Sequence, residues 1–457
     1  MRPSTALVVM LPLIVLVTLF VLVGTRGAGA GRSHDGMWWD EQIASFVRRR
    51  VAMTYVDDLD RERAAQAFYK AMDAYVHELD EYCDFIPPEE HRKWQEDTAG
   101  EYAGLGIKIT EADLGLLVVG VFPGGPADLA GMKPGDTIVA AGDTPLKGLD
   151  FKEIEASRLL KGEPGSIARI TVIPGPVPEE GEPTAAPKVV SVKRAKVRPP
   201  TVFVRRVGPE SEFGVIRLTE FAEATADDFN KALETMTSEG VKGLILDLRR
   251  NGGGVLPTAV AVVNRFVERG TIVRMEGRAP NATRVYEATA EDTLPDTLPL
   301  IVIVDGTSAS ASEVVAGALQ DHRRALLVGE RTYGKFLVQQ IVDIPGEDAA
   351  LQLTTSRYYL PSGRSYQRPR KNGRGHVEPR NGASPSQGGG LLPDVVLGLD
   401  EEQTEKLEKQ FINEEGVPWQ EEPQHDDVPL DWVDPQLERA IALLQGQMVL
   451  RKIRGTR

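Results

Sequence analysis

Two short apolar runs, residues 241–248 and 300–304, constrain the fold more than any other feature of the sequence. Each has the length of a buried strand, and each lies close to a stretch in which apolar residues recur at helical spacing. Strands are expected at 213–218, 241–248, 300–304 and 325–329, and helices at 226–237 and 310–320. This alternation favours right-handed crossovers onto a parallel sheet. Because ligands bind beyond the carboxyl ends of such strands, we expect a functional site in the loops after Leu248 and Val304.

The chain of 457 residues is too long for one hydrophobic core, so several packed units are expected. The sequence predicts a helical module, a β-rich domain with a Pro/Glu-rich insertion, an α/β core with a flexible loop, and an acidic tail with a closing helix. In that order they span 37–97, 98–197 (insertion 174–187), 198–400 (loop 368–390) and 401–457. The charge run between residues 400 and 427 is expected to be solvated surface.

Composition excludes several classes of function. A net charge of −14 argues against nucleic acid as a partner, because phosphate recognition depends on clustered Lys and Arg. Cys83 is the only cysteine, so neither an internal disulfide nor a multi-thiolate metal site can form. The six histidines stand singly, without the spacing that places two imidazoles on one helix face. We therefore predict no metal and no other cofactor.

The N-terminal segment, residues 1–32, predicts export. Its apolar run at 6–24 is intermediate in length between a signal-peptide core and a membrane span of about twenty residues. Ala28 and Ala30 would suit cleavage by a signal peptidase, whereas the length of the run favours an uncleaved anchor. We favour the anchor, and a secreted form after cleavage is the alternative; both place the protein in the periplasm or cell envelope.

Residues 305–313 (DGTSASASE) join an apolar strand to a helix. A hydroxyl at this junction lies at a helix N-terminus, where free N–H groups and the helix dipole favour developing negative charge. This makes Ser310 a candidate nucleophile. The same residues also fit a capping box, in which Ser310 and Glu313 only begin the helix.

Lys335 is the candidate base for that serine. A lysine can accept a proton only if burial lowers its pKa towards neutrality, and the apolar residues around 335 could supply that burial. An ordinary surface lysine is the alternative. A Ser-His-Asp arrangement with His322 is a rival, but His322 lies about three helical turns beyond Ser310, which puts it out of reach.

Several motifs occur in the order found in one peptidase family. Residues 308–313 (SASASE), 334–335 (GK) and 247–254 (DLRRNGGG) resemble motifs of the carboxyl-terminal processing peptidases, also called tail-specific proteases. The resemblance covers about residues 55–444 and includes 357–367, 392–395 and 434–437. It implies a serine endopeptidase with Ser310 as nucleophile, Lys335 as base and Gln339 as the residue that orients the base. Ala311 and Gly253, favoured over Gly254, would be the oxyanion donors.

The same resemblance assigns the β-rich domain. Residues 102–107 (YAGLGI) and 126–136 resemble a PDZ domain, so Gly104, Leu105, Gly106 and Ile107 should bind a peptide C-terminus. The implied fold is multidomain α/β, with a ClpP/crotonase-like peptidase core, an inserted PDZ domain and an N-terminal helical module. Substrates would be proteins or peptides with accessible C-termini; an adaptor and self-association stay open.

The chain also departs from the family pattern. Phe336 replaces the glycine that usually follows the lysine, Gly252 stands where many members have proline, and 368–390 is an added loop. None of these removes a catalytic group. A catalytically inactive PDZ scaffold on the same fold is the alternative to an enzyme, because fold alone does not fix function.

Overall fold

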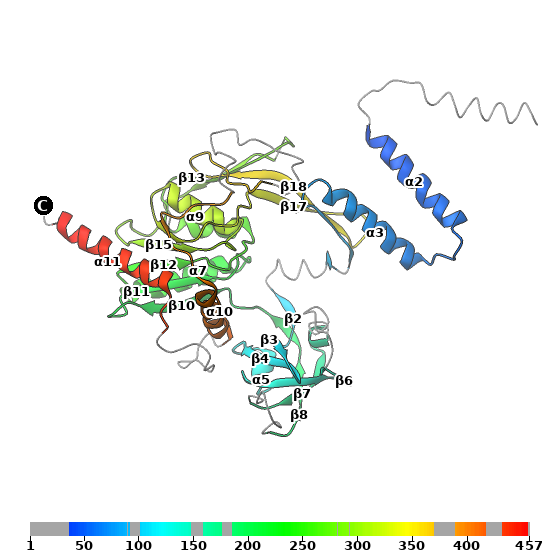
Figure 1. The fold of residues 1–457 in the computed structure, drawn as a ribbon, viewed down its shortest axis with the longest axis horizontal. Coiled ribbons are helices and arrows are strands. Elements are labelled where there is room, and N and C mark those ends of the chain that lie inside the picture. Colours follow the sequence, from blue (N-terminus) through cyan, green and yellow to red (C-terminus); the bar gives the residue numbers. More distant parts are fainter. Residues whose placement is uncertain are drawn as a thin grey trace, which may run out of the picture. The chain divides into compact units, whose positions relative to one another are not determined.

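A computed structural model (Figure 1) shows the arrangement of the chain. It describes residues 36–88, 90–91, 101–147, 159–175, 185–280, 282–291, 293–369, 389–416 and 432–455. The chain divides into two compact units, which are residues 1–72 and residues 73–457. The division falls inside the predicted helical module 37–97.

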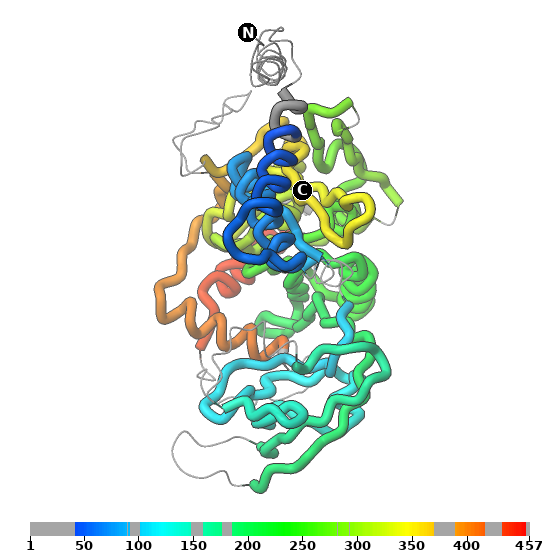
Figure 2. Tube along the Cα trace, turned by 90° about the vertical axis from the view of Figure 1, so that its right-hand side faces the viewer, coloured from blue at the N-terminus to red at the C-terminus, as the bar shows by residue number. Residues whose placement is uncertain are grey.

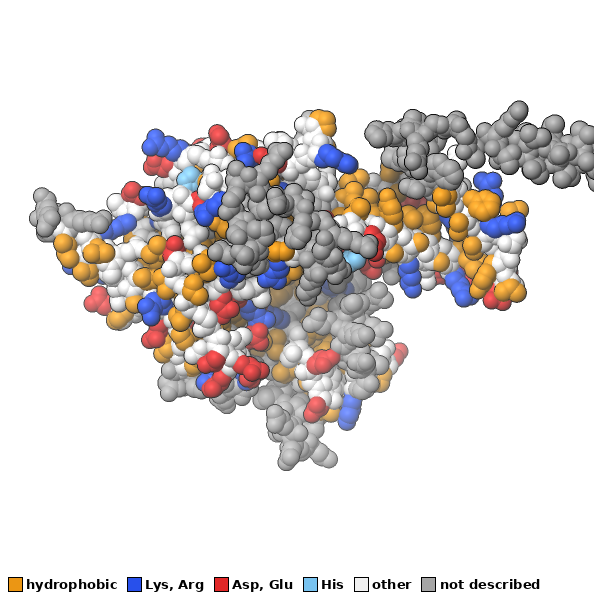
Figure 3. Space-filling model, turned by 45° about the horizontal axis from the view of Figure 1, so that its top comes forward, with side chains coloured by type: hydrophobic (Ala, Val, Ile, Leu, Met, Phe, Trp, Pro, Cys, Tyr) orange, Lys and Arg blue, Asp and Glu red, His pale blue; other side chains and the backbone are white. Residues whose placement is uncertain are grey.

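The first unit contains helix α2 (Gly36–Thr54) and most of α3 (Arg61–His77). The Arg48 guanidinium lies 4.7 Å from the centre of the Phe68 ring. Apolar side chains of α2 are exposed among charged ones (Figure 3). Phe46, for example, is 67% exposed. No helix in the described ranges is both long and apolar enough to cross a bilayer. The predicted anchor, residues 6–24, lies outside those ranges.

The centre of the second unit is a six-stranded sheet with the order β10-β11-β12-β15-β16-β19. Its strands are β10 (Val202–Val207), β11 (Phe213–Leu218), β12 (Gly243–Asp247), β15 (Leu300–Val304), β16 (Leu326–Gly329) and β19 (Val395–Val396). All neighbours pair in parallel except β10, which is antiparallel to β11. The parallel sheet predicted from the two apolar runs is confirmed.

Alternate side chains of each strand point to opposite faces, and helices cover both. Leu244 and Leu246 lie in the larger core with α7 (Thr225–Ser238), α8 (Leu256–Asn264) and α9 (Ala311–Asp321). Ile245 lies in a second core, against α11 (Pro435–Gly455). Because both faces are covered, the strands are continuously apolar rather than alternating.

A second sheet has the order β1-β18-β13-β14, with β17 also paired to β18. It consists of β1 (Asp84–Ile86), β13 (Gly270–Gly277), β14 (Arg284–Ala288), β17 (Leu337–Asp343) and β18 (Ala350–Tyr359). β17 begins two residues after Lys335, so the pairing of β17 with β18 fixes the chain that leaves this lysine.

The β-rich domain has its own sheet and core (Figure 2, cyan to green). Its sheet, in the order β3-β4-β5-β7-β8, comprises β3 (Ile107–Ala112), β4 (Gly115–Val121), β5 (Thr137–Ala141), β7 (Ile167–Ile173) and β8 (Lys188–Lys193). Smaller elements are β2 (Tyr102–Gly104), α5 (Pro126–Leu129), β6 (Thr144–Pro145) and β9 (Ala195–Val197). Residues 176–184 of the predicted insertion lie outside the described ranges.

The acidic side chains at 401, 402, 405 and 408 are exposed, as expected of the charge run, but the segment also has a buried face. Residues 401–416, expected to be solvated surface, form helix α10 (Glu401–Gly416), in which Leu407 and Phe411 are buried. The two apolar side chains are four residues apart and so share one helix face, which packs inward although the rest of the helix is acidic. Most of the added loop, residues 370–388, lies outside the described ranges.

Candidate active site

Ser310 lies at the turn from β15 into α9. Its backbone has φ of 54°, a left-handed conformation that is strained for a residue with a side chain. Ala309 and Ala311 on either side are buried, whereas Ser310 is partly exposed. The hydroxyl therefore lies at the N-terminus of α9, where Ser310 and Glu313 also form the capping box that the sequence allowed.

The loops after β12 and β15 lie against each other, as the sequence predicted. The Ser308 hydroxyl donates a hydrogen bond to Leu248 O at 2.8 Å. Asp305 Oδ1 accepts the N–H of Ser308 at 3.0 Å, and its Oδ2 accepts the N–H of Arg250 at 3.1 Å. The Asp305 carboxylate thus shapes its own loop and holds the neighbouring one.

Gly253 is in direct contact with the Ser310 turn. A Cβ at this position would lie 2.9 Å from Ser310 Cβ and 3.0 Å from Ala311 N, and the residue has φ of 110°. Its N–H donates to Asn251 Oδ1 at 2.9 Å. Gly253 is therefore next to the expected oxyanion site, but its N–H is bonded within its own loop. Ala311 is the first residue of α9. The assignment of the Gly253 and Ala311 N–H groups as oxyanion donors stays a prediction.

Glu313 joins the serine turn to the lysine loop. Its Oε2 accepts the N–H of Ser310 at 3.0 Å and that of Lys335 at 2.8 Å. Its Oε1 accepts the Thr332 hydroxyl at 2.5 Å and the Gly334 N–H at 2.7 Å. Burial raises the pKa of this carboxyl, while the four donors act to lower it. From the sequence, Glu313 is recognised only as part of a capping box. The spacing of residues in the sequence does not indicate its hydrogen bonds to residues 332–335.

The pKa of Lys335 changes in the direction that a general base requires. Burial lowers the pKa of its amine, and the carboxylates of Asp80 and Asp84 partly oppose that effect. Its Nζ lies 4.8 Å from the centre of the Tyr82 ring. Among the described residues, the amine is thus placed over this ring and not in a hydrogen bond with Ser310. The Glu313 carboxylate brings the two backbones together, but the two side chains do not meet in this conformation.

Gln339, expected to orient the lysine, makes a different contact. Its side-chain Nε2 donates to Thr354 Oγ1 at 3.1 Å, and that hydroxyl bonds to Asp80 Oδ1, also at 3.1 Å. Gln339 therefore connects with one of the carboxylates that act on Lys335. Direct orientation of the amine by Gln339 stays a prediction.

Phe336 is a buried core residue. Its side chain is fully buried and packs edge-on against Tyr366, with ring centres 5.8 Å apart. Its N–H donates to Gln367 Oε1 at 2.7 Å, and its carbonyl accepts the N–H of Tyr358 at 2.9 Å. The phenylalanine that replaces the usual glycine thus fixes the backbone directly after the lysine.

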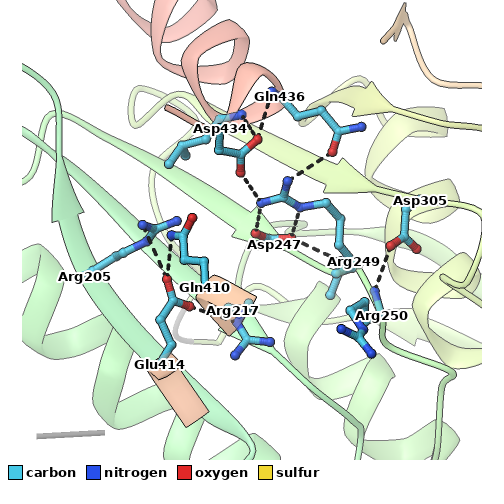
Figure 4. A network of polar contacts seen from close by, with 12 residues as sticks. Arg205, Arg217, Asp247, Arg249, Arg250, Asp305, Gln410, Glu414, Asp434 and Gln436 are labelled. Carbon is cyan, nitrogen blue, oxygen red and sulfur yellow. Dashed lines mark hydrogen bonds and ion pairs between the residues drawn. The ribbon is translucent and has the colours of Figure 1, made fainter. Parts of the chain in front are cut away.

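Asp247 and Arg249 of the DLRRNGGG motif form a buried ion pair (Figure 4). Asp247 Oδ2 lies 2.6 Å from Arg249 Nη2, and both side chains have 0% exposure. Burial alone would raise the pKa of Asp247, but the guanidinium lowers it below its usual range. Both groups are therefore charged, and the pair is a structural part of the loop.

The predicted peptide-binding loop begins β3, which is an edge strand among the described strands. The Leu105 and Gly106 carbonyls accept N–H groups from within the domain, at 2.8 and 2.9 Å. Burial raises the pKa of Tyr102 to about 12, although the N–H groups of Ile107 and Gly106 act to lower it. Binding of a peptide carboxylate by this loop stays a prediction.

His322 lies apart from this site, whereas Cys83 adjoins it, because the Thr354 N–H contacts Cys83 Sγ at 3.4 Å. His322 ends α9, at the opposite end from Ser310, and its Nε2 contacts Thr271 O at 2.8 Å. Cys83 is a buried free thiol. No group of three or more His, Cys, Asp or Glu side chains in the described ranges could hold a metal ion.

Comparison with known proteins identifies the family. Residues 212–378 match Peptidase family S41, and residues 117–174 match the PDZ domain. The carboxy-terminal-processing protease of Bartonella bacilliformis is 34% identical over 363 residues, which cover 78% of this chain and 75% of that protein. This chain belongs to the carboxy-terminal processing protease family. The resemblance found in the motifs is confirmed.

Other members show similar coverage. The chloroplastic C-terminal processing peptidase of Tetradesmus obliquus is 32% identical over 349 residues, 73% of each chain. A solved photosystem II D1 C-terminal processing protease is 28% identical and covers 84% of this chain and 92% of its own, with a TM-score of 0.43. As a carboxy-terminal processing protease, the chain is a serine-type peptidase with a PDZ domain, as expected.

Proposed function

We propose that this carboxy-terminal processing protease is an exported endopeptidase in which Ser310 is the nucleophile and Lys335 the general base. The observation that carries the proposal is the Glu313 carboxylate, one oxygen of which accepts the N–H groups of both residues. That shared oxygen places the strained serine turn beside a lysine whose pKa burial lowers. A serine and a lysine in this relation suit acyl transfer without a histidine.

The reaction begins when Lys335 Nζ leaves the Tyr82 ring and reaches the Ser310 hydroxyl. Ser310 Oγ then attacks the peptide carbonyl carbon, and its proton passes to the neutral amine. N–H groups at Ala311 and Gly253 stabilise the oxyanion, with the Gly253 N–H released from Asn251. The lysine next protonates the leaving amine. Finally, it takes a proton from the water that hydrolyses the acyl-enzyme and returns that proton to Ser310.

Substrate selection is assigned to the PDZ domain. The loop at Gly104, Leu105, Gly106 and Ile107 would bind the terminal carboxylate, and β3, an edge strand among those described, would pair with the peptide backbone. Proteins with accessible C-termini are the substrates that this arrangement fits. An adaptor protein and self-association stay possible additions to this arrangement.

The mechanism is tested by cleavage of an unfolded reporter protein. The wild type should cleave it, whereas Ser310→Ala and Lys335→Ala should each lower kcat by about 10³-fold or more, because neither group works without the other. A fluorophosphonate probe should label the wild type at Ser310. Equal cleavage by all three proteins would refute the mechanism, and wild type that folds but neither cleaves nor is labelled would favour the PDZ scaffold.

Export is the second part of the proposal. Residues 6–24 are proposed to anchor the chain in the inner membrane, with the described domains in the periplasm. The full chain should then stay in the membrane pellet after extraction at alkaline pH. An exported protein whose N-terminus begins just after Ala30 would show cleavage instead, and retention in the cytosol would overturn both forms.

A further inference from the structure

The turn that begins α11 lies near the C-terminus in sequence but contacts the loop of residues 249–253, which adjoins Ser310 (Figure 4). Asp434 Oδ1 accepts the N–H of Gln436 at 3.0 Å and that of Leu437 at 3.2 Å. It is therefore the N-cap of α11. Capping uses only one of the two carboxylate oxygens, which leaves Oδ2 for another partner.

That partner is Arg249. Asp434 Oδ2 lies 2.8 Å from Arg249 Nη2, and Gln436 Oε1 accepts a hydrogen bond from Nη1 at 3.0 Å. On its other side the guanidinium donates from Nε to Asp247 at 2.9 Å. The Arg249 side chain has 0% exposure, so water cannot replace any of these partners.

Phe411 of α10 completes the enclosure of this arginine. The Arg249 guanidinium lies 5.2 Å from the centre of the Phe411 ring, and the Arg217 guanidinium lies 4.1 Å from it. A ring face near a desolvated cation stabilises the cation. Both C-terminal helices thus contribute a side chain to the Arg249 site.

Arg249 is two residues from the contacts that support Ser310. The Asn251 carbonyl accepts the N–H of Ala309 at 3.1 Å and the Ser312 hydroxyl at 2.9 Å. Arg250, between Arg249 and Asn251 in the chain, has φ of 59°. A residue with a side chain keeps this conformation only where its surroundings impose it. A shift of the Arg249 side chain would therefore move Asn251 and, with it, Gly253.

We propose that Asp434 and Gln436 are positioning residues of the active site. They hold Arg249, and through Arg249 they keep the loop of residues 249–253 against the Ser310 turn. Neither touches substrate. The C-terminal segment, which lies outside the Peptidase family S41 match at 212–378, is thereby a working part of the catalytic centre. The inference depends on Ser310 as the nucleophile in the proposed function.

The test compares Asp434→Asn with a matched control in the full-length chain. Asparagine is as good an N-cap as aspartate, so this variant keeps the start of α11 and removes only the charge that faces Arg249. Asp400→Asn is the control, because Asp400 Oδ1 accepts the Gln403 N–H at 2.8 Å at the start of α10. In the described part of the chain, Asp400 does not contact Arg249. We expect Asp434→Asn to lower kcat roughly 10- to 100-fold, and Asp400→Asn to leave it within about twofold.

A second readout separates positioning from loss of fold. Active-site titration gives kcat per folded site, and a peptide aldehyde that forms a tetrahedral adduct with Ser310 reports on the oxyanion site. Asp434→Asn should weaken aldehyde affinity about tenfold or more while KM changes by less than about twofold. Gln436→Met, which keeps a side chain of similar length and removes the amide oxygen that accepts from Arg249, should lower kcat several-fold and is the second variant if Asp434→Asn does not fold.

The outcomes separate this inference from the proposed function. Unchanged kcat per titrated site and unchanged aldehyde affinity in Asp434→Asn, or in Gln436→Met where it replaces that variant, overturn the positioning role and leave the Ser310 mechanism intact. Wild type that is no more active than Ser310→Ala refutes the mechanism instead, whatever the result at 434.

Discussion

At the scale of single residues, Gly253 and Gly252 are neighbours with opposite requirements. A side chain at 253 would meet Ala309 O, Ser310 Cβ and Ala311 N at 3.0 Å or less, whereas a Cβ at 252 would meet nothing within 4 Å. Gly253 also has φ of 110°, which only glycine adopts readily. The loop therefore needs glycine at 253 for contact with the serine turn, but not at 252.

We expect Gly253→Ala to lower kcat by about 10²- to 10³-fold, the size of effect seen when an oxyanion donor is lost. The added methyl group must push the loop away from Ser310. Gly252→Ala is the matched control and should retain activity within about twofold, because its side chain enters open space. Kinetics on a short peptide substrate would check this, and equal losses in both variants would count against a special role for 253.

The proposed role of Lys335 as general base implies that activity depends on pH. The amine must be neutral to accept a proton, so kcat/KM should rise with pH through the pKa of Lys335, and burial places that midpoint below the ordinary lysine value. Asp80 opposes this shift by favouring the charged amine. In Asp80→Asn the midpoint should therefore move to lower pH. The pH profile of kcat/KM measures this; an unchanged midpoint, or one at higher pH, would show that the carboxylate does not act on the base.

At the scale of elements, the periodicity of apolar residues was sufficient to predict the strands and the helix that carry the site. Strands predicted at 213–218 and 300–304 have those bounds, and the helix predicted from 310 begins at Ala311. Apolar runs and helical spacing reflect burial, which local sequence records directly. The meeting of the two strand-end loops followed from the parallel order alone.

Contacts between distant segments could not be predicted in the same way. Glu313 fits a capping box in the sequence, yet in the structure it also accepts N–H groups from the lysine loop. Residues 401–416 have an acidic composition, so the sequence did not indicate that one face of this helix, which includes Phe411, is buried. In both cases the partner is fixed by tertiary packing, and nothing in the local spacing identifies it.

At the scale of the whole molecule, helix α10 contacts two domains of the second unit. Glu415 accepts hydrogen bonds from Lys108 of β3 and from Arg217 of β11, the latter at 2.8 Å. Burial acts to raise the pKa of Glu415, but the two cations outweigh it and lower the pKa. Because Lys108 directly follows the predicted peptide-binding loop, this carboxylate joins the PDZ domain to the peptidase sheet.

We expect Glu415→Gln to lower the free energy of unfolding by about 1–2 kcal/mol at neutral pH, between the values typical of exposed and of buried ion pairs. A carboxylate with a lowered pKa stabilises the fold above its unfolded-state pKa, and that stability is lost as pH falls through the lowered value. The difference between wild type and variant in urea unfolding should therefore shrink in acid.

Glu402→Gln is the matched control on the same helix. Glu402 pairs with Lys406 at 2.7 Å, but its side chain is 76% exposed, so its loss should change stability by less than about 0.5 kcal/mol at any pH. If Glu415 joins the two domains, Glu415→Gln alone should also make the linker between β9 and β10 more sensitive to limited proteolysis. Equal stability changes in the two variants at neutral pH, or a difference that persists in acid, would mean that the Glu415 carboxylate carries no more than a surface ion pair does.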